Sequence, residues 1–297
     1  MPDGTTCSCN TQQTTDQETV SGCSGAACSS CHDAAPAPLS SEVKKPLNKI
    51  GETIVVMSGK GGVGKSTIAV NIAISLQMAG FRVGILDSDI HGPSIPTMLG
   101  VPSGSIMEND GCFLPIAAHG LKVISIGYFL ENTDDAVIWR GPVKAGVITQ
   151  FINDVVWGEL DYLVVDSPPG TGDEPLTVCQ SIDGKVSAVI VTTPQKVADV
   201  DVRKSISFCR DLPVPILGII ENMSGFVCPH CGEVTELFGV GGGKALAEEF
   251  SLPFLGAVPI DPAIVVSGDT GQPFVDRYRE SVSAQVLNKI LSSLIPT

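Results

Sequence analysis

The sequence predicts an α/β fold: a doubly wound, mostly parallel sheet with helices on both faces. Three observations support this prediction. From Ile50 onward, short runs rich in β-branched residues alternate with helical patterns, which is the element order of α/β proteins. Residues 54–56 and 163–165 are apolar throughout, as strands covered on both faces are. A glycine-rich loop at residues 59–67 joins the first of these strands to a helix.

The strands are expected in a regular order along the chain, separated by stretches with helical spacing or by longer connections. They cover residues 53–57, 82–86, 121–126, 162–165, 186–191, 216–220 and 254–258. The helix after the first strand carries Ile68, Ile72 and Leu76 on one face. The helical pattern around residues 286–294 has one lysine, Lys289, whereas membrane-surface helices usually carry several basic residues. We therefore expect this last helix to pack into the core.

Residues 1–48 differ in composition from the rest of the chain. They are rich in Cys, Ser, Thr, Gly and Pro and show neither a helical nor a strand period. We therefore expect a flexible, cysteine-rich tail, followed by one domain over residues 49–297.

The charge and the absence of export signals limit the possible functions. Eighteen basic against 32 acidic residues give a formal net charge of −14, which repels nucleic acid phosphates and anionic lipid headgroups. Neither nucleic acid nor membrane is therefore expected as a partner. The sequence has no apolar stretch of bilayer length and no signal-peptide pattern, so we expect a cytoplasmic protein. In that reducing compartment, ten cysteines indicate metal or redox chemistry before disulfides.

The glycine-rich loop fits the phosphate-binding pattern G-x-x-x-x-G-K-[ST], between a strand and a helix as that pattern requires. Its glycines allow backbone N–H groups to approach phosphate oxygens at the positive end of the helix dipole. We predict that Lys65 bridges the β- and γ-phosphates and that Ser66 binds Mg²⁺, so that ATP and Mg²⁺ are cofactors. The predicted nucleotide-binding residues of the loop are Gly59, Lys60, Gly61, Gly62, Val63, Gly64, Lys65, Ser66 and Thr67.

Three carboxylates follow predicted strands, at the edge where an open parallel sheet binds its ligands. Asp87 and Asp89 come directly after the strand at 82–86. We predict that Asp87 positions the hydrolytic water and that Asp89, in the same switch, contributes to Mg²⁺ binding. Asp166 ends the apolar strand at 162–165 in a Walker B pattern and is predicted to hold Mg²⁺ through its water shell.

Cys228 and Cys231 form a C-x-x-C pair followed by glycine, a spacing that places two thiolates on one metal ion or cluster. Zinc and iron–sulfur clusters usually need four ligands, and the predicted domain has no second such pair. The missing ligands must come from elsewhere, and a symmetric dimer would supply them. Spacing alone leaves zinc and iron–sulfur open. The glycine-rich residues 238–244 lack the spacing and the Ser or Thr of a phosphate loop, so we expect a flexible loop before a helix.

Lys60 makes the phosphate loop resemble the deviant Walker A motif, K-G-G-x-G-K-[ST], of the group that contains MinD, ParA and the nitrogenase iron protein. In that group the early lysine reaches the phosphate of the nucleotide in the facing subunit. The resemblance implies a P-loop NTPase fold of that kind and a homodimer bridged by nucleotide. It also implies that Lys60, Lys65 and Asp87 form the catalytic set of a weak ATP hydrolase.

A longer stretch, from about residue 51 to residue 262, resembles the Mrp/ApbC iron–sulfur cluster carrier ATPases and their eukaryotic cytosolic scaffold branch. The matching blocks are residues 58–67, 87–94, 139–142, 166–173, 193–195 and 221–224, the last leading to Cys228 and Cys231. The resemblance implies a homodimer that holds a [4Fe–4S] cluster between its two cysteine pairs and passes it to apo-proteins. Slow ATP hydrolysis would gate cluster loading or release, and Asn222 would contact the adenine.

The tail of the scaffold branch carries the pattern C-x13-C-x2-C-x5-C. Here Cys9 and Cys23 have the thirteen-residue gap, but the next gaps, to Cys28 and Cys31, are four and two. The order therefore departs from that pattern. Two interpretations follow: a second cluster on Cys9, Cys23, Cys28 and Cys31, or a disordered, redox-sensitive tail.

Other functions share this fold. A positioning ATPase of the MinD or ParA kind predicts a basic surface or a basic amphipathic terminus, and the sequence has neither. A zinc-bridged ATPase dimer without cluster transfer fits the C-x-x-C pair as well as a cluster does. Fold alone does not choose among these functions.

Overall fold

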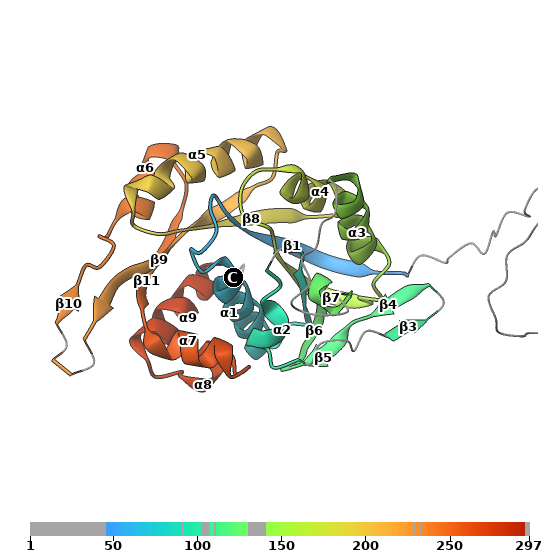
Figure 1. Ribbon diagram of the computed structural model, residues 1–297, viewed down its shortest axis with the longest axis horizontal. Helices are drawn as coiled ribbons and strands as arrows, with labels where there is room; N and C mark the ends of the chain where they lie inside the picture. Colours follow the sequence, from blue (N-terminus) through green and yellow to red (C-terminus); the bar gives the residue numbers. More distant parts are fainter. Residues whose placement is uncertain are drawn as a thin grey trace, which may run out of the picture. The chain divides into compact units, whose positions relative to one another are not determined.

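The computed structural model describes residues 46–90, 92–101, 107–109, 111–129, 141–228, 230–231 and 233–294. These residues form a nine-stranded sheet (Figure 1). Its strands are β1 (Lys49–Ser58), β2 (Val83–Asp87), β5 (Ile116–Ala118), β6 (Leu121–Ser125), β7 (Glu159–Asp166), β8 (Val186–Thr192), β9 (Ile216–Val227), β10 (Val234–Thr235) and β11 (Phe254–Ile260). A separate two-stranded ribbon pairs β3 (Met107–Asn109) with β4 (Cys112–Leu114).

The strand order confirms the predicted, mostly parallel sheet. It runs β10-β9-β8-β1-β7-β2-β6-β5, and β11 also pairs with β9. The strands from β9 to β6 pair in parallel, whereas β5 and β10 are antiparallel to their neighbours. Every expected strand is present. The main difference is β9, which we expected at residues 216–220 and which continues to Val227 because the polar Glu221 and Asn222 are buried with hydrogen-bond partners.

Helices cover both faces of the sheet (Figure 1). On one face lie α1 (Lys65–Met78), α7 (Pro262–Asp269), α8 (Phe274–Arg277) and α9 (Val282–Leu294). On the other face lie α3 (Gly141–Asn153), α4 (Asp173–Ser181), α5 (Lys196–Asp211) and α6 (Gly242–Phe250). The short α2 (Ile95–Met98) follows β2, and the 3₁₀ turn η1 (Ile126–Phe129) follows β6.

Alternate residues of the central strand β1 belong to different cores. Ile54 and Val56 pack in the core that contains α1 and α9, whereas Val55 and Met57 pack in the core of α3 and α4. Burying a side chain of this size stabilises a protein by about 1.5–3 kcal/mol. An apolar run without alternation is therefore what a strand between two helical layers requires.

The C-terminal helix α9 packs into the first of these cores, as expected. Its stripe of Leu287, Ile290, Leu291 and Leu294 is buried. Within the part of the chain that the structure describes, no helix combines the length and the apolar character that a bilayer crossing needs.

The carboxyl ends of three neighbouring strands meet at one edge of the sheet. Val56 of β1 and Asp87 of β2 both align with Asp166 of β7. The glycine-rich loop follows β1 at this same edge and leads into α1. Strand register thus brings together groups that are far apart in the sequence.

Candidate nucleotide and cluster sites

The glycine-rich loop between β1 and α1 needs glycine at its first and sixth positions. Gly64, the N-cap of α1, has a φ of 83°, and a Cβ there would lie 2.2 Å from Nδ2 of Asn222. A Cβ on Gly59 would lie 2.4 Å from the backbone carbon of Asp201 in α5. The loop is therefore fixed against α5 at its start and against Asn222 near its end.

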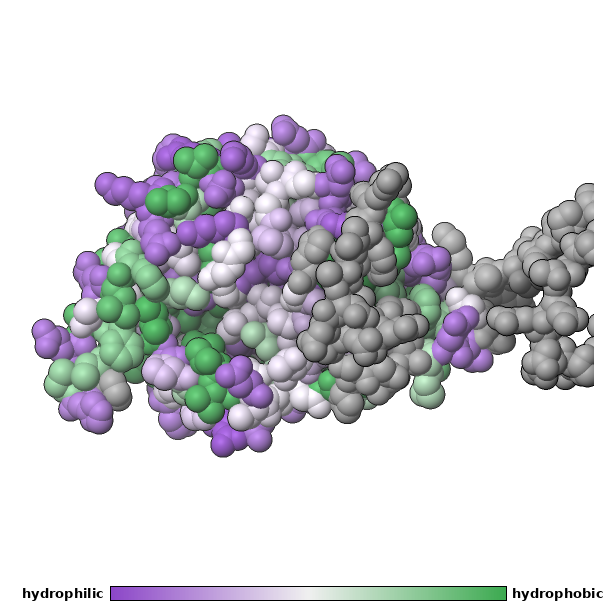
Figure 2. Space-filling model, in the orientation of Figure 1, coloured by the Kyte–Doolittle hydropathy of each residue, from purple (hydrophilic) through white to green (hydrophobic). Residues whose placement is uncertain are grey.

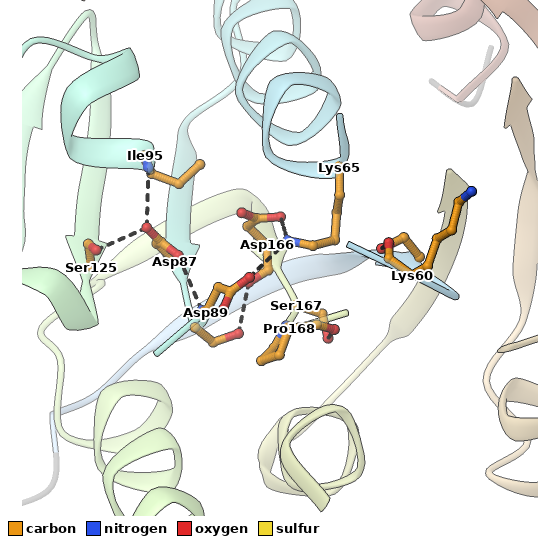
Figure 3. Close-up of polar contacts among 11 residues, drawn as sticks. Lys60, Lys65, Asp87, Asp89, Ile95, Ser125, Asp166, Ser167 and Pro168 are labelled. Carbon is orange, nitrogen blue, oxygen red and sulfur yellow. Dashed lines mark hydrogen bonds and ion pairs between the residues drawn. The ribbon is translucent and has the colours of Figure 1, made fainter. Parts of the chain in front are cut away.

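Lys65 is buried at the start of α1, and its ammonium lies among carboxylates (Figure 3). Its Nζ is 2.5 Å from Oδ1 of Asp166 and 3.9 Å from Oδ2 of Asp89. Charge-assisted contacts of this kind are about twice as strong as neutral hydrogen bonds. Phosphate oxygens could take over the charge compensation that Asp166 supplies here, so the lysine is placed to bind them.

The carboxyl group of Asp166 has the character of a magnesium ligand. Its Oδ2 is buried and accepts no hydrogen bond within the described residues, which leaves an acidic oxygen for a cation or its water shell. Burial raises the pKa of Asp166, and the Lys65 ammonium and then the Ser66 hydroxyl oppose that rise. The interaction with Ser66 also means that two predicted Mg²⁺ ligands lie together. An oxygen-binding cation fits this donor set.

Asp87 is fully buried on the other side of Asp166 and is held by protein donors (Figure 3). Its Oδ2 accepts hydrogen bonds from the hydroxyl of Ser125 at 3.0 Å and from the backbone N–H of Ile95 at 3.2 Å. Its Oδ1 accepts one from the N–H of Asp89 at 3.2 Å. Burial, followed by the charge of Asp166, raises the pKa of Asp87. Oδ1 accepts only one of these bonds, so it keeps the capacity to accept another from a water.

Two adjoining cavities open beside the loop. The smaller, of about 290 Å³, is lined by the loop together with Asp89 and Pro169. The larger, of about 600 Å³, is mostly apolar and reaches Asn222 and Ile264. Gly64 lines both cavities. Their sizes and linings suit phosphates in the first and a base with its ribose in the second.

Asn222 lies where the larger cavity meets the loop. Its side chain is 6% exposed, and Nδ2 donates to the carbonyl oxygen of Val63 at 2.9 Å. The donation from Nδ2 orients the side chain, and its amide oxygen could accept a hydrogen bond from an exocyclic amine such as that of adenine.

Glu221 is a fully buried carboxylate that our sequence interpretation missed. It accepts hydrogen bonds from the backbone N–H groups of Gly241 at 2.9 Å and Gly243 at 2.6 Å, and from the Ser224 hydroxyl at 2.5 Å. The glycine-rich residues 238–244, which we expected to be a flexible loop, are thus attached to β9 at the start of α6. The available signal was an acidic residue directly after an apolar strand pattern.

Lys60 points away from Lys65 and from the aspartates (Figure 3). Its Nζ donates to Oε1 of Gln195 at 3.0 Å. Gln195 is the N-cap residue of α5, on the far side of the loop. The two lysines of the motif therefore lie in different surroundings, one among carboxylates and one beside a neutral amide.

Cys228 and Cys231 lie in the turn between β9 and β10. Cys228 is half-buried, Cys231 is exposed, and both are free thiols. The backbone N–H groups of Cys231 and His230 lower the pKa of Cys228, which favours the thiolate that binds metals. Within the described residues, no three His, Cys, Asp or Glu side chains are grouped to hold a metal ion. The pair offers two thiolate ligands at an exposed turn.

The geometry agrees with a comparison against known families. The family model described as "NUBPL iron-transfer P-loop NTPase", of ParA type, matches residues 49–295. The chain belongs to this family. As an NUBPL-type P-loop NTPase it shares the nucleotide-hydrolysing fold of the group, which confirms the predicted family resemblance and fold class.

Named relatives of this NUBPL-type chain are similar over most of their length. The "Cytosolic Fe-S cluster assembly factor NUBP2 homolog" of Trichoplax adhaerens is 48% identical over 257 residues, covering 85% of this chain and 97% of the relative. The "Iron-sulfur cluster carrier protein" of Methanocaldococcus jannaschii is 52% identical over 235 residues, covering 79% and 81%.

Solved structures show the same fold. The nucleotide-binding protein of Archaeoglobus fulgidus, in complex with ADP and with Co found in it, is 43% identical, with a TM-score of 0.67 and coverage of 77% of this chain and 89% of that one. The cell division ATPase MinD of Pyrococcus furiosus is 21% identical, with a TM-score of 0.62 and coverage of 82% and 98%. The second similarity concerns the fold alone.

The structure of this NUBPL-type NTPase brings together part of the predicted site. Lys65, Ser66 and Asp89 line the smaller cavity. Asp166 pairs with Lys65, and Asp87 lies beside Asp166 in the sheet. Lys60 and the pair Cys228/Cys231 lie elsewhere. The predicted tail ligands and part of the block at 139–142 lie outside the described residues. Cys112 and Cys209 are buried and Cys179 is half-buried, and burial raises the pKa of Cys179 to about 11.

Proposed function

We propose that the chain is an ATP-binding, slowly hydrolysing carrier that assembles a [4Fe–4S] cluster across a homodimer and delivers it to apo-proteins in the cytoplasm. The observation that carries this proposal is the exposed Cys228/Cys231 turn, which ends the same strand, β9, that places Asn222 in the nucleotide cavity. The names of the relatives, a cluster carrier and a cytosolic assembly factor, support the carriage of a cluster.

Two thiolates supply half the ligands that a [4Fe–4S] cluster needs. A second copy of the chain, related by a twofold axis, would bring the same two cysteines from the opposite side. The cluster, which is cargo, would then be held at the edge of both subunits. Such a position would leave it accessible to an acceptor protein.

Hydrophobic side chains around the cysteine turn support an interface there (Figure 2). Val227 is 39% exposed, Val234 62% and Leu237 56%. Contiguous exposed apolar residues usually mark a surface that another protein covers. A homodimer that closes over the two turns would bury them.

The nucleotide site supports a slow switch. Mg²⁺, when bound, would be held by Ser66, Asp89 and Asp166 and would neutralise phosphate charge. Lys65 would bind the phosphates, and Asp87, held in place by Ser125 and Ile95, would orient the water. Because three protein donors already share the charge of Asp87, it would be a weak acceptor for that water, which favours slow turnover. Nucleotide would then act by favouring one conformation over another.

A membrane-positioning ATPase has less support. In that hypothesis α9 would serve as a membrane anchor, but its apolar stripe of Leu287, Ile290, Leu291 and Leu294 is buried in the core. The likeness to MinD, at 21% identity, concerns the fold.

Cluster loading of the full chain tests the proposal. Three variants are compared with the natural sequence under anaerobic conditions with iron and sulfide. They are Cys228→Ala/Cys231→Ala, the matched control Cys9→Ser/Cys23→Ser/Cys28→Ser/Cys31→Ser, and the two sets combined. Iron and sulfide content, visible absorption, sedimentation and transfer to an apo form of a [4Fe–4S] enzyme are measured.

We expect the tail variant to keep one cluster for every two chains, sediment as a dimer and activate the apo-enzyme. The combined variant should take up no cluster, because both sets of thiolates are gone. A full chromophore in the combined variant would refute the bridging site. If the tail variant stayed colourless, bound zinc between two chains and took up no sulfide, the protein would be a zinc-bridged dimer and not a cluster carrier.

A further inference from the structure

The early lysine of the phosphate loop is held by a residue from a distant part of the chain. Lys60 and Gln195 are 135 positions apart, and their side chains meet with Nζ 3.0 Å from Oε1. In the proposed homodimer, if the motif works as in the deviant Walker A group, Lys60 would reach a phosphate bound to the second copy. The contact with Gln195 keeps its ammonium on its own subunit.

Both partners have fixed backbones. The Ser58 hydroxyl donates to the carbonyl oxygen of Lys60 at 3.0 Å, and Gly59 is pressed against Asp201 of α5. The carbonyl of Gln195 accepts from the N–H of Ala198 at 2.8 Å, at the start of the same helix. Because the backbones are held, the contact can be made or broken by the two side chains alone.

The side chain of Gln195 is not needed for its own helix. Gln195 is the N-cap residue of α5, yet its side chain makes no capping hydrogen bond to α5. Its amide oxygen accepts from Lys60 instead. A good N-cap residue would be Ser, Thr, Asp or Asn, so glutamine here is explained better by the lysine than by the helix.

We propose that Gln195 is a positioning residue that latches Lys60 to its own subunit and releases it when a nucleotide phosphate of the second copy replaces the amide. This inference rests on the homodimer of the proposed function. A neutral amide suits a reversible latch, because it holds an ammonium less strongly than a carboxylate would and less strongly than the charged phosphate that competes for it.

The latch predicts opposite effects for two substitutions at one position. Gln195→Leu removes the acceptor and frees Lys60, so ATP should drive dimerisation more readily. Gln195→Glu places a carboxylate opposite the ammonium, so Lys60 should be held more firmly and dimerisation should weaken. A defect in folding or in α5 would shift both variants in the same direction, which distinguishes positioning from structure.

The first measurement is the rate at which an amine-acylating reagent labels Lys60 in the full chain, read by peptide mass spectrometry relative to Lys244, whose side chain is 63% exposed. We expect labelling about threefold faster in Gln195→Leu and about threefold slower in Gln195→Glu, the size of one modest charge-assisted contact. Gln285→Leu and Gln285→Glu, at an exposed residue of α9, are the matched controls and should leave Lys60 labelling unchanged.

The second measurement is the dimer dissociation constant with a non-hydrolysable ATP analogue, by sedimentation. We expect it to fall about threefold in Gln195→Leu and to rise at least about threefold in Gln195→Glu. Unchanged labelling in both variants, or dimerisation that shifts in one direction for both, overturns the latch. If the natural sequence stays monomeric with the analogue, the proposed homodimer is wrong, and so is the release of Lys60 by a phosphate of the second copy. The labelling ratio reports separately on the contact between Lys60 and Gln195.

Discussion

The Glu221→Ala change removes the carboxylate that accepts three hydrogen bonds where β9 meets the start of α6. The bond from the Gly243 N–H, at 2.6 Å, is buried, so this donor would be left without a partner, at a cost of about 1–3 kcal/mol. Gly241 is exposed and Ser224 is half-buried, so water can replace their bonds more cheaply. Loss of these bonds to a carboxylate adds roughly 1 kcal/mol. We therefore expect a total loss of about 2–4 kcal/mol in the free energy of unfolding.

Glu221→Gln refines this expectation. The amide keeps one oxygen for the Gly243 N–H but presents an NH₂ group, a donor, where the second carboxylate oxygen was. The expected loss is about 1–2 kcal/mol, between the natural sequence and the alanine variant. The matched control is Glu248→Ala on the exposed side of α6, whose side chain is 70% exposed and 3.9 Å from Lys244. An exposed pair of this kind is worth about 0–1 kcal/mol.

Urea unfolding of the full chains, followed by circular dichroism and extrapolated linearly to water, measures these differences. We expect the largest loss in the free energy of unfolding for Glu221→Ala, a smaller loss for Glu221→Gln and the smallest for Glu248→Ala. If Glu221→Ala lost no more stability than Glu248→Ala, Glu221 would not attach α6 to β9 in the way described. A glutamine variant as unstable as the alanine variant would contradict the assignment of the bonds to individual oxygens.

Two further changes test the loop and the edge of the sheet. Gly64→Ala should weaken ADP binding at least about tenfold in a fluorescent nucleotide titration, because the φ of Gly64 is 83° and the added Cβ would meet Asn222. The control Gly146→Ala in α3, where a Cβ meets nothing within 4 Å, should leave the ADP affinity unchanged. Equal effects of the two changes would contradict the steric argument. Hydrogen bonds from Arg82 hold the pKa of Asp161 at about 2, below its ordinary 3.8, so this carboxylate contributes stability above pH 3.8 that is lost as the pH falls toward 2. Arg82→Gln should therefore unfold at higher pH than the natural sequence in an acid titration, and an unchanged midpoint would refute this contribution.

The features found from sequence are those that a local pattern records. The apolar runs at residues 54–56 and 163–165, which lack alternating polar residues, predict buried strands. The spacing of glycine, lysine and serine identifies the phosphate loop. The features that were missed depend on tertiary contacts: Glu221 and Asn222 extend β9 because their side chains find partners at Gly243 and Val63. Periodicity could not predict that two polar residues would be buried in a strand. The Lys60–Gln195 contact likewise depends on how the loop packs on α5.

The position of Glu221 determines how the nucleotide site and the cysteine turn can influence each other. β9 pairs with β8 as far as Glu221, and its later residues pair with β11 and β10. Met223 and Gly225, with φ of 59° and 76°, interrupt the regular strand just beyond this point. The segment between Asn222 and Cys228 pairs with β11 and β10, so a movement that passes from Asn222 to the thiols would pass through these pairings. Glu221 fixes the start of this segment to α6, so a displacement of Asn222 would act on the pairings with β11 and β10 and on the cysteine turn rather than on the central sheet.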